Sequence, residues 1–251
     1  MNIKAYLERI NYQGTLAPNA ETLRGLQVAH LLAVPFENLS IHAKEPIVLD
    51  DEALFEKIVG RGRGGFCYEA NGLFAALLRA LGFRVAMLSA EVAGASGGFG
   101  PAFDHMALMV TLEQRWLVDV GFGDSFREPL LLDERGVQSQ GGDAYRILSD
   151  GDYMTLKRRY EGEWKNEYRF TLRPYQYADF AEMCRYHQTS PQSHFTRGRV
   201  CSRATVDGRI TLAGMRFIET SNDGSRRERT LTSEEEYAAL LRERFGVVMA
   251  G

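Results

Sequence analysis

The sequence predicts an α+β fold in three successive parts: a helical part over residues 1–83, an antiparallel β-barrel or curled sheet over 84–188, and a smaller part with strands and a helix over 189–251. Two observations support this prediction. The spacing of apolar residues changes near residue 84 from the helical period of about 3.6 to the strand period of about two. In addition, 251 residues with 45% hydrophobic content are enough to bury a large core.

The helical part has apolar residues three and four positions apart along most of its length. Two stretches begin after residues that commonly cap helices, Asn19 and the pair Asp50 and Asp51. The clearest helix begins near residue 67, and its apolar face consists of Ala70, Leu73, Phe74, Leu77, Leu78 and Leu81. Gly82 is suited to end this helix.

Alternation of apolar and polar residues dominates from about residue 84. It is clear in five segments, RVAMLSAEV, HMALMVTL, RWLVDVGF, YMTLKRRY and WKNEYRFTL. Gly, Asp and Ser turns separate these segments, which is typical of an antiparallel sheet that curls or closes. After residue 189, we expect strands around 210–212 and 215–218. A helix should then start with a capping box at Ser233 and Glu236 and end before Gly246.

Composition and charge exclude several classes of protein. The formal net charge of −3 gives no basic field for nucleic acid, and the short run GSRRERT is better interpreted as a solvated hairpin or loop. No segment approaches the roughly 18 apolar residues of a membrane span, and Lys4, Glu8 and Arg9 lie where a signal peptide needs an apolar run. The three cysteines form no disulfide framework. We therefore expect a cytoplasmic protein with no nucleic acid or membrane partner.

Cys67 stands between a glycine-rich turn and the predicted helix, in RGRGGFCYEA. At a helix start, free backbone N–H groups and the positive end of the dipole favour the thiolate over the thiol. Gly64 and Gly65 allow a tight turn and close approach of a substrate. A free cysteine is commonly a packing residue, and we expect that role for Cys184 and Cys201. Cys67 lies off the apolar face of its helix, which favours a nucleophile.

A nucleophilic thiol needs a base, and the base needs an acceptor that orients it. His105 and Asp119 lie on two segments that should form a hairpin turning near residues 113–115. They share a face of the sheet if the loop has an odd number of residues or a bulge. Asp119 interrupts the apolar run LVDVGF, where an ionised carboxylate needs a partner to offset its desolvation. The structural alternatives are a half-buried histidine and a turn or edge aspartate.

The other candidate residues are also explained by structural roles. His30 lies near the apolar face of a helix, which favours a structural role, and His42 fits either role. A zinc site would use the pattern C-x2-H-x6-H-x6-C, formed by Cys184, His187, His194 and Cys201. This spacing matches no familiar structural zinc site, so no metal is expected. The glycine-rich stretch 94–103 lacks the Lys and Ser/Thr of a nucleotide-binding loop; it could hold a phosphate with backbone N–H groups, but simple flexibility is favoured.

Five stretches together resemble the arylamine N-acetyltransferase family. They occur in the family's order and read VPFENLSIH (34–42), RGGFCYE (63–69), HMALMV (105–110), LVDVGFG (117–123) and SPQSHF (190–195). The resemblance covers most of the chain and weakens after about residue 200. It implies a helical N-terminal domain over 1–83, a β-barrel over 84–188 and an α/β lid over 189–251, with a Cys-His-Asp triad between the first two.

The resemblance also implies roles for particular residues. Cys67 would be the nucleophile that takes the acyl group, His105 the base, and Asp119 the acceptor that fixes the imidazole. The cleft for the acyl group and the flat amine would be lined by Phe36, Phe122 and Phe195. Arg63 and Glu37 resemble an ion pair that braces the turn before the nucleophile.

The activity implied is transfer of an acetyl group from acetyl-coenzyme A to small aromatic amines or hydrazines, by ping-pong kinetics through an acetyl-cysteine. It would serve xenobiotic metabolism or biosynthesis. Three other functions remain open: an amide synthase of polyketide biosynthesis with the same triad, a cysteine hydrolase, and a binding protein that kept the fold. The aromatic residues of the cleft argue against water as the acceptor, and the intact triad argues against a binding protein.

Overall fold

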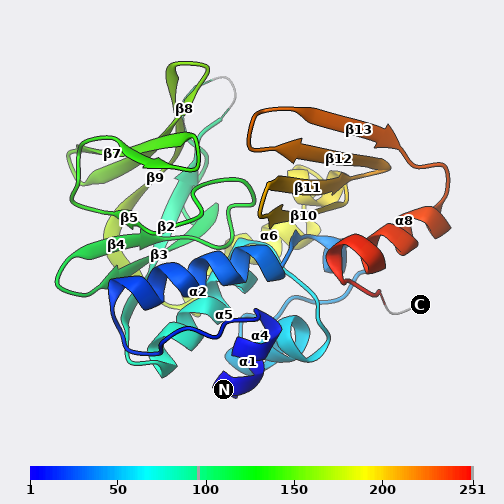
Figure 1. The fold of residues 1–251 in the computed structure, drawn as a ribbon, viewed down its shortest axis with the longest axis horizontal. Coiled ribbons are helices and arrows are strands. Elements are labelled where there is room, and N and C mark those ends of the chain that lie inside the picture. Colours follow the sequence, from blue (N-terminus) through cyan, green and yellow to red (C-terminus); the bar gives the residue numbers. More distant parts are fainter. Residues whose placement is uncertain (95–96, 250–251) are drawn as a thin grey trace.

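Helices form one side of the molecule, and two sheets pack onto them (Figure 1). The computed structural model describes residues 1–94 and 97–249. The predicted α+β class, with helices first and a barrel second, is confirmed. The helical elements are α1 (Ile3–Arg9), α2 (Ala20–Ala33), α3 (Leu39–His42), α4 (Asp51–Phe55), the π-helical turn η1 (Glu56–Gly60) and α5 (Cys67–Ala80).

Helix α5 forms the centre of the helical domain. Every residue from Cys67 to Leu78 is buried, so the helix is enclosed on all sides and not only along its predicted apolar face. It packs against α1, α4, β2 and β3, which places its first turn at the border between helices and barrel. The predicted caps are present, because Asn19 accepts a hydrogen bond from Thr22 N and Asp50 accepts from Glu52 N.

The barrel is an antiparallel sheet of eight strands in the order β5-β4-β3-β2-β9-β8-β7-β6. Its strands are β2 (Arg84–Val92), β3 (His105–Thr111), β4 (Arg115–Val118), β5 (Leu130–Leu131), β6 (Gln138–Gln140), β7 (Asp143–Asp150), β8 (Tyr153–Tyr160) and β9 (Glu163–Tyr175). The five segments predicted from alternation correspond to β2, β3, β4, β8 and β9. The short strands β5 and β6 and the longer β7 were not predicted.

Side-chain amides join the two end strands of the barrel. Gln138 accepts a hydrogen bond from Leu131 N at 2.8 Å and donates one to Leu131 O at 2.9 Å. Gln140 accepts from Glu128 N at 3.0 Å and donates to Glu128 O at 2.7 Å. These amides take the place of a backbone ladder between β5 and β6, so the barrel is nearly closed and its edges are covered.

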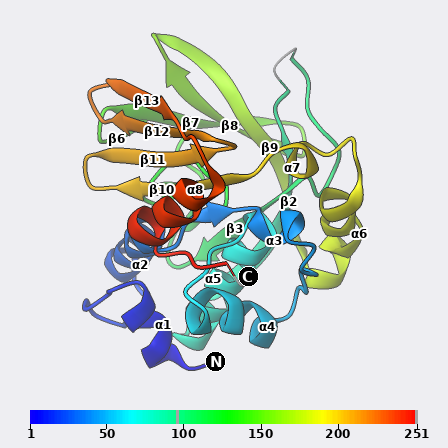
Figure 2. The same ribbon diagram turned by 90° about the vertical axis from the view of Figure 1, so that its right-hand side faces the viewer.

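One element departs from the predicted strand zone. Residues Tyr177–Thr189 form helix α6, which packs beside α5 at the edge of the helical domain (Figure 2). Its buried residues Phe180, Cys184 and His187 follow the helical spacing i, i+4, i+7, a signal that the neighbouring alternating segments obscured. The short helix α7 (His194–Arg197) follows it.

The C-terminal part is a second sheet, β1-β10-β11-β12-β13, covered by a helix. Its elements are β1 (Phe36–Glu37), β10 (Val200–Thr205), β11 (Gly208–Ala213), β12 (Arg216–Ser221), β13 (Arg226–Thr230), α8 (Glu234–Leu240) and the π-helical turn η2 (Leu241–Phe245). Strand β1 comes from the helical region of the chain and pairs with β10, which ties the C-terminal sheet to the start of the protein.

The predicted features of the C-terminal part are mostly present. The last five residues of the run GSRRERT form the exposed strand β13 of a hairpin. Ser233 caps α8 by accepting from Glu236 N, whereas the Glu236 carboxylate accepts from Thr232 N, one residue before the expected partner. Gly246 ends the helical stretch in a left-handed conformation. Within the residues that the structure describes, no helix has both the length and the apolar character needed to cross a membrane.

Candidate active site

Cys67 is the first residue of α5, as the sequence predicted, and only 3% of it is exposed. The turn before it is packed against other backbone. A Cβ on Gly64 would lie 1.9 Å from Pro35 O, and a Cβ on Gly121 would lie 2.7 Å from the Cys67 Cα. Gly64 therefore serves close packing of the chain against itself rather than the approach of a substrate, and the loop after β4 fits directly over the start of α5.

His105 and Asp119 lie together because the hairpin loop has the odd length that the sequence argument required. Thr111 pairs with Arg115 across a loop of three residues, 112–114, so paired positions sum to an even number. His105 opens β3, and Asp119 follows the last residue of β4. The His105 Nε2 atom lies 2.7 Å from Asp119 Oδ2, and both residues are buried.

Asp119 is surrounded by hydrogen-bond donors. In addition to His105, Asn71 Nδ2 donates at 2.8 Å, the Gly121 N–H at 2.9 Å and the Tyr168 hydroxyl at 3.1 Å. Burial alone would raise the pKa of Asp119, but the charge of His105 and the hydrogen bonds from His105, Asn71 and Gly121 outweigh it and lower the pKa below its ordinary value. The carboxylate therefore stays ionised and holds the imidazole in one orientation.

Asn71 and Tyr168 were not predicted as site residues. Asn71 lies one helical turn after Cys67, and its carbonyl oxygen also accepts a hydrogen bond from Val120 N at 2.8 Å. An amide in an otherwise apolar helix was the available signal, because a buried polar side chain needs partners. Tyr168 lies on β9, 49 positions beyond Asp119 in the chain, so no local sequence pattern could have paired them.

Burial changes the expected state of the thiol. It raises the pKa of Cys67 well above its ordinary value, and the backbone hydrogen bond from Met106 opposes this only in part. Burial thus acts on this sulfur in the direction opposite to the effect expected from the helix start. Ionisation of Cys67 therefore requires a base that accepts its proton.

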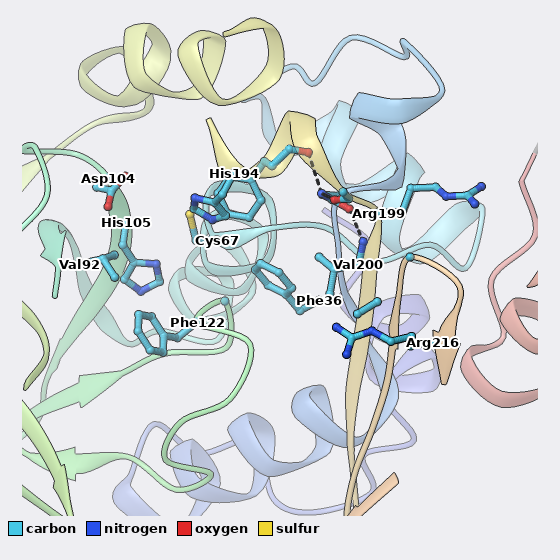
Figure 3. A pocket seen from close by; sticks show the side chains of 16 residues that line it. Phe36, Cys67, Val92, Asp104, His105, Phe122, His194, Arg199, Val200 and Arg216 are labelled. Atoms are coloured by element: carbon cyan, nitrogen blue, oxygen red, sulfur yellow. Dashed lines mark hydrogen bonds between the residues drawn. The ribbon is translucent and has the colours of Figure 1, made fainter. Parts of the chain in front are cut away.

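A pocket of about 600 Å³ opens onto these residues. Cys67, His105 and the rings of Phe36, Phe122 and Phe195 line it, together with residues that the sequence did not single out for this site: Val92, Asp104, His194, Arg199, Val200 and Arg216. Figure 3 shows His105 and Phe122 on one side of the pocket and Arg216 on the opposite side. The lining is mainly apolar, and its two arginines come from the first residue of β12 and from the residue just before β10.

Buried charges support the turn that carries Cys67. Arg63 Nη2 lies 2.9 Å from Glu37 Oε1, which is the ion pair that the resemblance implied. Lys57 Nζ lies 2.7 Å from Glu69 Oε1, and Glu69 Oε2 accepts a hydrogen bond from Phe66 N at 3.1 Å. Burial raises the pKa of Glu69, and the nearby Lys57 opposes this rise. Glu69 thus caps the helix start while Lys57 compensates its charge.

The remaining candidates lie elsewhere or serve the packing. Cys184 belongs to the core around α5, whereas Cys201 belongs to the core of the C-terminal sheet, so the proposed C-x2-H-x6-H-x6-C residues are not gathered at one site. His30 is fully buried beside Tyr6, in agreement with a structural role. His42 Nε2 contacts the Phe195 carbonyl at 3.0 Å. Ala95 and Ser96, in the glycine-rich stretch, lie outside the described residues.

Comparison with known proteins places the chain in a family. The family model described as N-acetyltransferase matches residues 19–251. An arylamine N-acetyltransferase of Escherichia coli is 35% identical over 96% of this chain and 87% of that protein. A proansamycin X synthase of Amycolatopsis mediterranei is 33% identical over 96% of this chain and 95% of that protein.

A solved structure agrees with these matches. The Mycobacterium marinum arylamine N-acetyltransferase in complex with CoA superimposes with a TM-score of 0.91 and 33% identity, covering 98% of this chain and 93% of that one. The chain therefore belongs to the arylamine N-acetyltransferase family of enzymes.

Proposed function

We propose that this enzyme transfers an acetyl group from acetyl-coenzyme A to the nitrogen of small aromatic amines or hydrazines, through an acetyl-cysteine at Cys67. The observation that carries the proposal is one pocket wall with Cys67 and His105 together, and with Asp119 bound to the far side of the imidazole. The activity named for the Escherichia coli relative and the CoA bound in the Mycobacterium marinum structure support the same acceptor and donor.

In the first half-reaction, His105 Nδ1 takes the proton of the Cys67 thiol, while Asp119 holds the Nε2–H. The thiolate attacks the thioester carbonyl, the bond from this carbon to the coenzyme A sulfur breaks, and the imidazolium returns the proton to the departing thiolate. One thioester replaces another, so the step is nearly balanced in free energy. The raised pKa of Cys67 means that the thiolate forms mainly as this proton moves to His105.

In the second half-reaction, the neutral amine attacks the acetyl carbon. His105 takes the proton from the attacking nitrogen, the bond from carbon to sulfur breaks, and Cys67 leaves as the thiolate and regains a proton from the imidazolium. Aromatic amines suit this step because they are weak bases and stay neutral near pH 7. Phe36, Phe122 and Phe195 favour a flat apolar acceptor and disfavour water, which protects the acetyl-enzyme from hydrolysis.

The pocket is large enough for the donor and acceptor to use it in turn. Its volume of about 600 Å³ falls in the range of sites for small ligands. Arg199 and Arg216 line the pocket, and each pairs with a glutamate, Glu234 at 2.7 Å and Glu228 at 3.2 Å. Their guanidinium groups suit the phosphate groups of coenzyme A, which would take the place of these carboxylates.

Steady-state kinetics with acetyl-coenzyme A and 4-methoxyaniline test the proposal. Ping-pong transfer predicts parallel double-reciprocal lines as the amine concentration varies, and no activity in Cys67→Ser. Intersecting lines would mean that both substrates bind together before transfer, which contradicts an acetyl-cysteine intermediate.

A second candidate is the amide synthase that the family resemblance also left open, and the synthase named among the relatives favours it. It would use the same nucleophile and base, but its acyl donor would be a bulky carrier-bound thioester rather than acetyl-coenzyme A. A short N-acetylcysteamine thioester of an aryl-containing acyl chain distinguishes the two. Faster acylation of Cys67 by this thioester than by acetyl-coenzyme A would favour the synthase.

A further inference from the structure

His187, a residue of the rejected zinc pattern, is buried at the centre of a cluster next to the pocket. It lies on α6, with 2% of the residue exposed, and it is not part of the pocket wall. Its ring stacks on Tyr68, with centroids 6.1 Å apart and an angle of 29° between the rings. The edge of Phe195 meets it at 5.0 Å and 88°.

Both ring nitrogens of His187 face polar groups. Nδ1 lies 3.0 Å from the hydroxyl of Ser193, which also accepts a hydrogen bond from Phe195 N at 3.2 Å and so caps α7. Nε2 lies 3.2 Å from Asp104 Oδ1, within ion-pair distance but away from the direction of a hydrogen bond. The contact to Ser193 is therefore the better formed of the two.

The partners of His187 are neighbours in sequence of the pocket residues. Tyr68 follows Cys67, Asp104 precedes His105, and Ser193 lies two residues before Phe195. The Tyr68 hydroxyl also donates to the Phe103 carbonyl at 2.7 Å. One imidazole thus joins the starts of α5, β3 and α7.

Helix α7 depends on few other polar contacts to the rest of the protein. Asn38 Nδ2 donates to the Phe195 carbonyl at 2.9 Å, and His42 Nε2 contacts the same oxygen at 3.0 Å. These two side chains hold the main chain of Phe195 from the side of α3. From the side of α6, His187 holds it through Ser193, the N-cap residue of α7.

We propose that His187 is a positioning residue that fixes α7 against the start of β3 and thereby sets where the Phe195 ring lies in the acceptor pocket. It does not exchange protons with the substrate, because its nitrogens face Ser193 and Asp104 and its ring lies behind the wall. The effect on the acceptor pocket rests on the proposed acetyl transfer. The structural coupling of α6 to α7 through His187 does not depend on that function.

Rapid kinetics of the two half-reactions provide the first test. In His187→Leu, we expect the rate of acetylation by acetyl-coenzyme A to stay within about threefold of wild type, while kcat/KM for 4-methoxyaniline falls about tenfold through a higher KM. His187→Asn keeps a polar atom near the Nδ1 position and should restore KM to within about threefold. His187→Gln places its amide toward Asp104 and should not restore it.

His30→Leu is the matched control, because it also removes a buried histidine. His30 is fully buried on α2, and its Nδ1 lies 2.9 Å from the Tyr6 hydroxyl, outside the pocket. It should lower stability without changing KM for the amine. Equal losses in both half-reactions of His187→Leu, or the same rise of KM in His30→Leu, would overturn the proposal.

Hydrogen–deuterium exchange tests the coupling without turnover. His187→Leu should speed exchange in residues 190–198, which include α7, and His30→Leu should not. Unchanged exchange in this segment would overturn the proposal even if acetyl transfer is established. If wild type takes no acetyl group, the proposed function fails, but faster exchange of 190–198 in His187→Leu alone would still support the positioning role.

Discussion

Two histidine–aspartate pairs border the same pocket, and they differ in what surrounds each partner. Asp119 has a fully buried side chain and receives four hydrogen bonds, and His105 uses one nitrogen for it while its ring lines the pocket. In the other pair, Asp104 itself borders the pocket, with 16% of its side chain exposed, and His187 lies behind the wall.

The difference indicates what a histidine needs in order to act as a base. Among the described residues, none forms a hydrogen bond with His105 Nδ1, so this nitrogen remains for Cys67 or a substrate. Both nitrogens of His187 face protein groups, which suits a role in positioning. A pairing with aspartate is therefore insufficient evidence of catalysis, and the free nitrogen toward the pocket decides the assignment.

Loss of the Asp119 charge should break the first pair with the largest effect on rate. Asp119→Asn keeps the shape and an acceptor oxygen but removes the charge that stabilises the imidazolium. We expect kcat to fall by about 10³- to 10⁴-fold, as for the aspartate of a serine protease triad. Steady-state assays check this, and circular dichroism should report an intact fold. A loss below about tenfold would contradict the role of Asp119.

The next test concerns the start of α5, which carries Cys67 and Tyr68. The buried ion pair of Lys57 with Glu69 supports this helix start. Lys57→Met would leave Glu69 without its partner at 2.7 Å. We expect the free energy of unfolding to fall by about 3 to 5 kcal/mol, because breaking a buried ion pair leaves an uncompensated charge. Urea denaturation measures this change.

Lys4→Met is the control for Lys57→Met. Lys4 forms an exposed pair with Glu8 at 3.8 Å on α1, and solvent screens this interaction. Its loss should change stability very little. Equal effects of the two substitutions would show that burial of the Lys57 pair does not matter.

The second pair should be much less sensitive to its aspartate. Asp104→Asn keeps the side-chain volume and removes only the charge near His187 Nε2, which is the less well formed contact. We expect kcat/KM for the amine to fall by about 3- to 10-fold, because α7 keeps its contact through Ser193. A loss as large as that of Asp119→Asn would mean that the two pairs do not differ as argued.

His30 extends the comparison to a buried histidine without an aspartate. Burial, with a smaller contribution from the charge of Arg9, lowers the pKa of His30 to about 3. Below about pH 6.5 the unfolded chain binds a proton that the folded one excludes, so His30 lowers stability as pH falls from about 6.5 toward 3 by about 1.4 kcal/mol per unit. His30→Gln should flatten this slope in chemical denaturation between pH 6.5 and 5, with little effect on activity. An unchanged dependence of stability on pH in His30→Gln would contradict a His30 that is buried and neutral in the folded protein.

The sequence predicted the parts of the site that depend on local rules. A helix start fixes Cys67, and the parity of a three-residue loop brings His105 and Asp119 to one face. The aromatic residues Phe36, Phe122 and Phe195 were identified from the resemblance, and all three line the pocket, although their roles remain predictions.

The features of the site that the sequence did not predict depend on contacts between distant segments of the chain. Tyr168 reaches Asp119 from another strand, and His187 reaches Asp104 from a helix that follows the barrel. Burial, a property of the whole fold, raises the pKa of Cys67, whereas the local helix start was expected to lower it. Helix α6 was missed because its three buried residues are a weak signal beside long alternating strands.

The acetyl-enzyme is the intermediate on which the whole account depends, and intact mass spectrometry detects it directly. Wild type, Cys67→Ser and Asp119→Asn are incubated briefly with acetyl-coenzyme A in the absence of amine, and an aromatic hydrazine is then added. We expect one adduct of about 42 Da on wild type only, which the hydrazine removes. No adduct on a wild-type protein whose Cys67 is reduced, or an adduct that persists in Cys67→Ser, would contradict covalent transfer through Cys67.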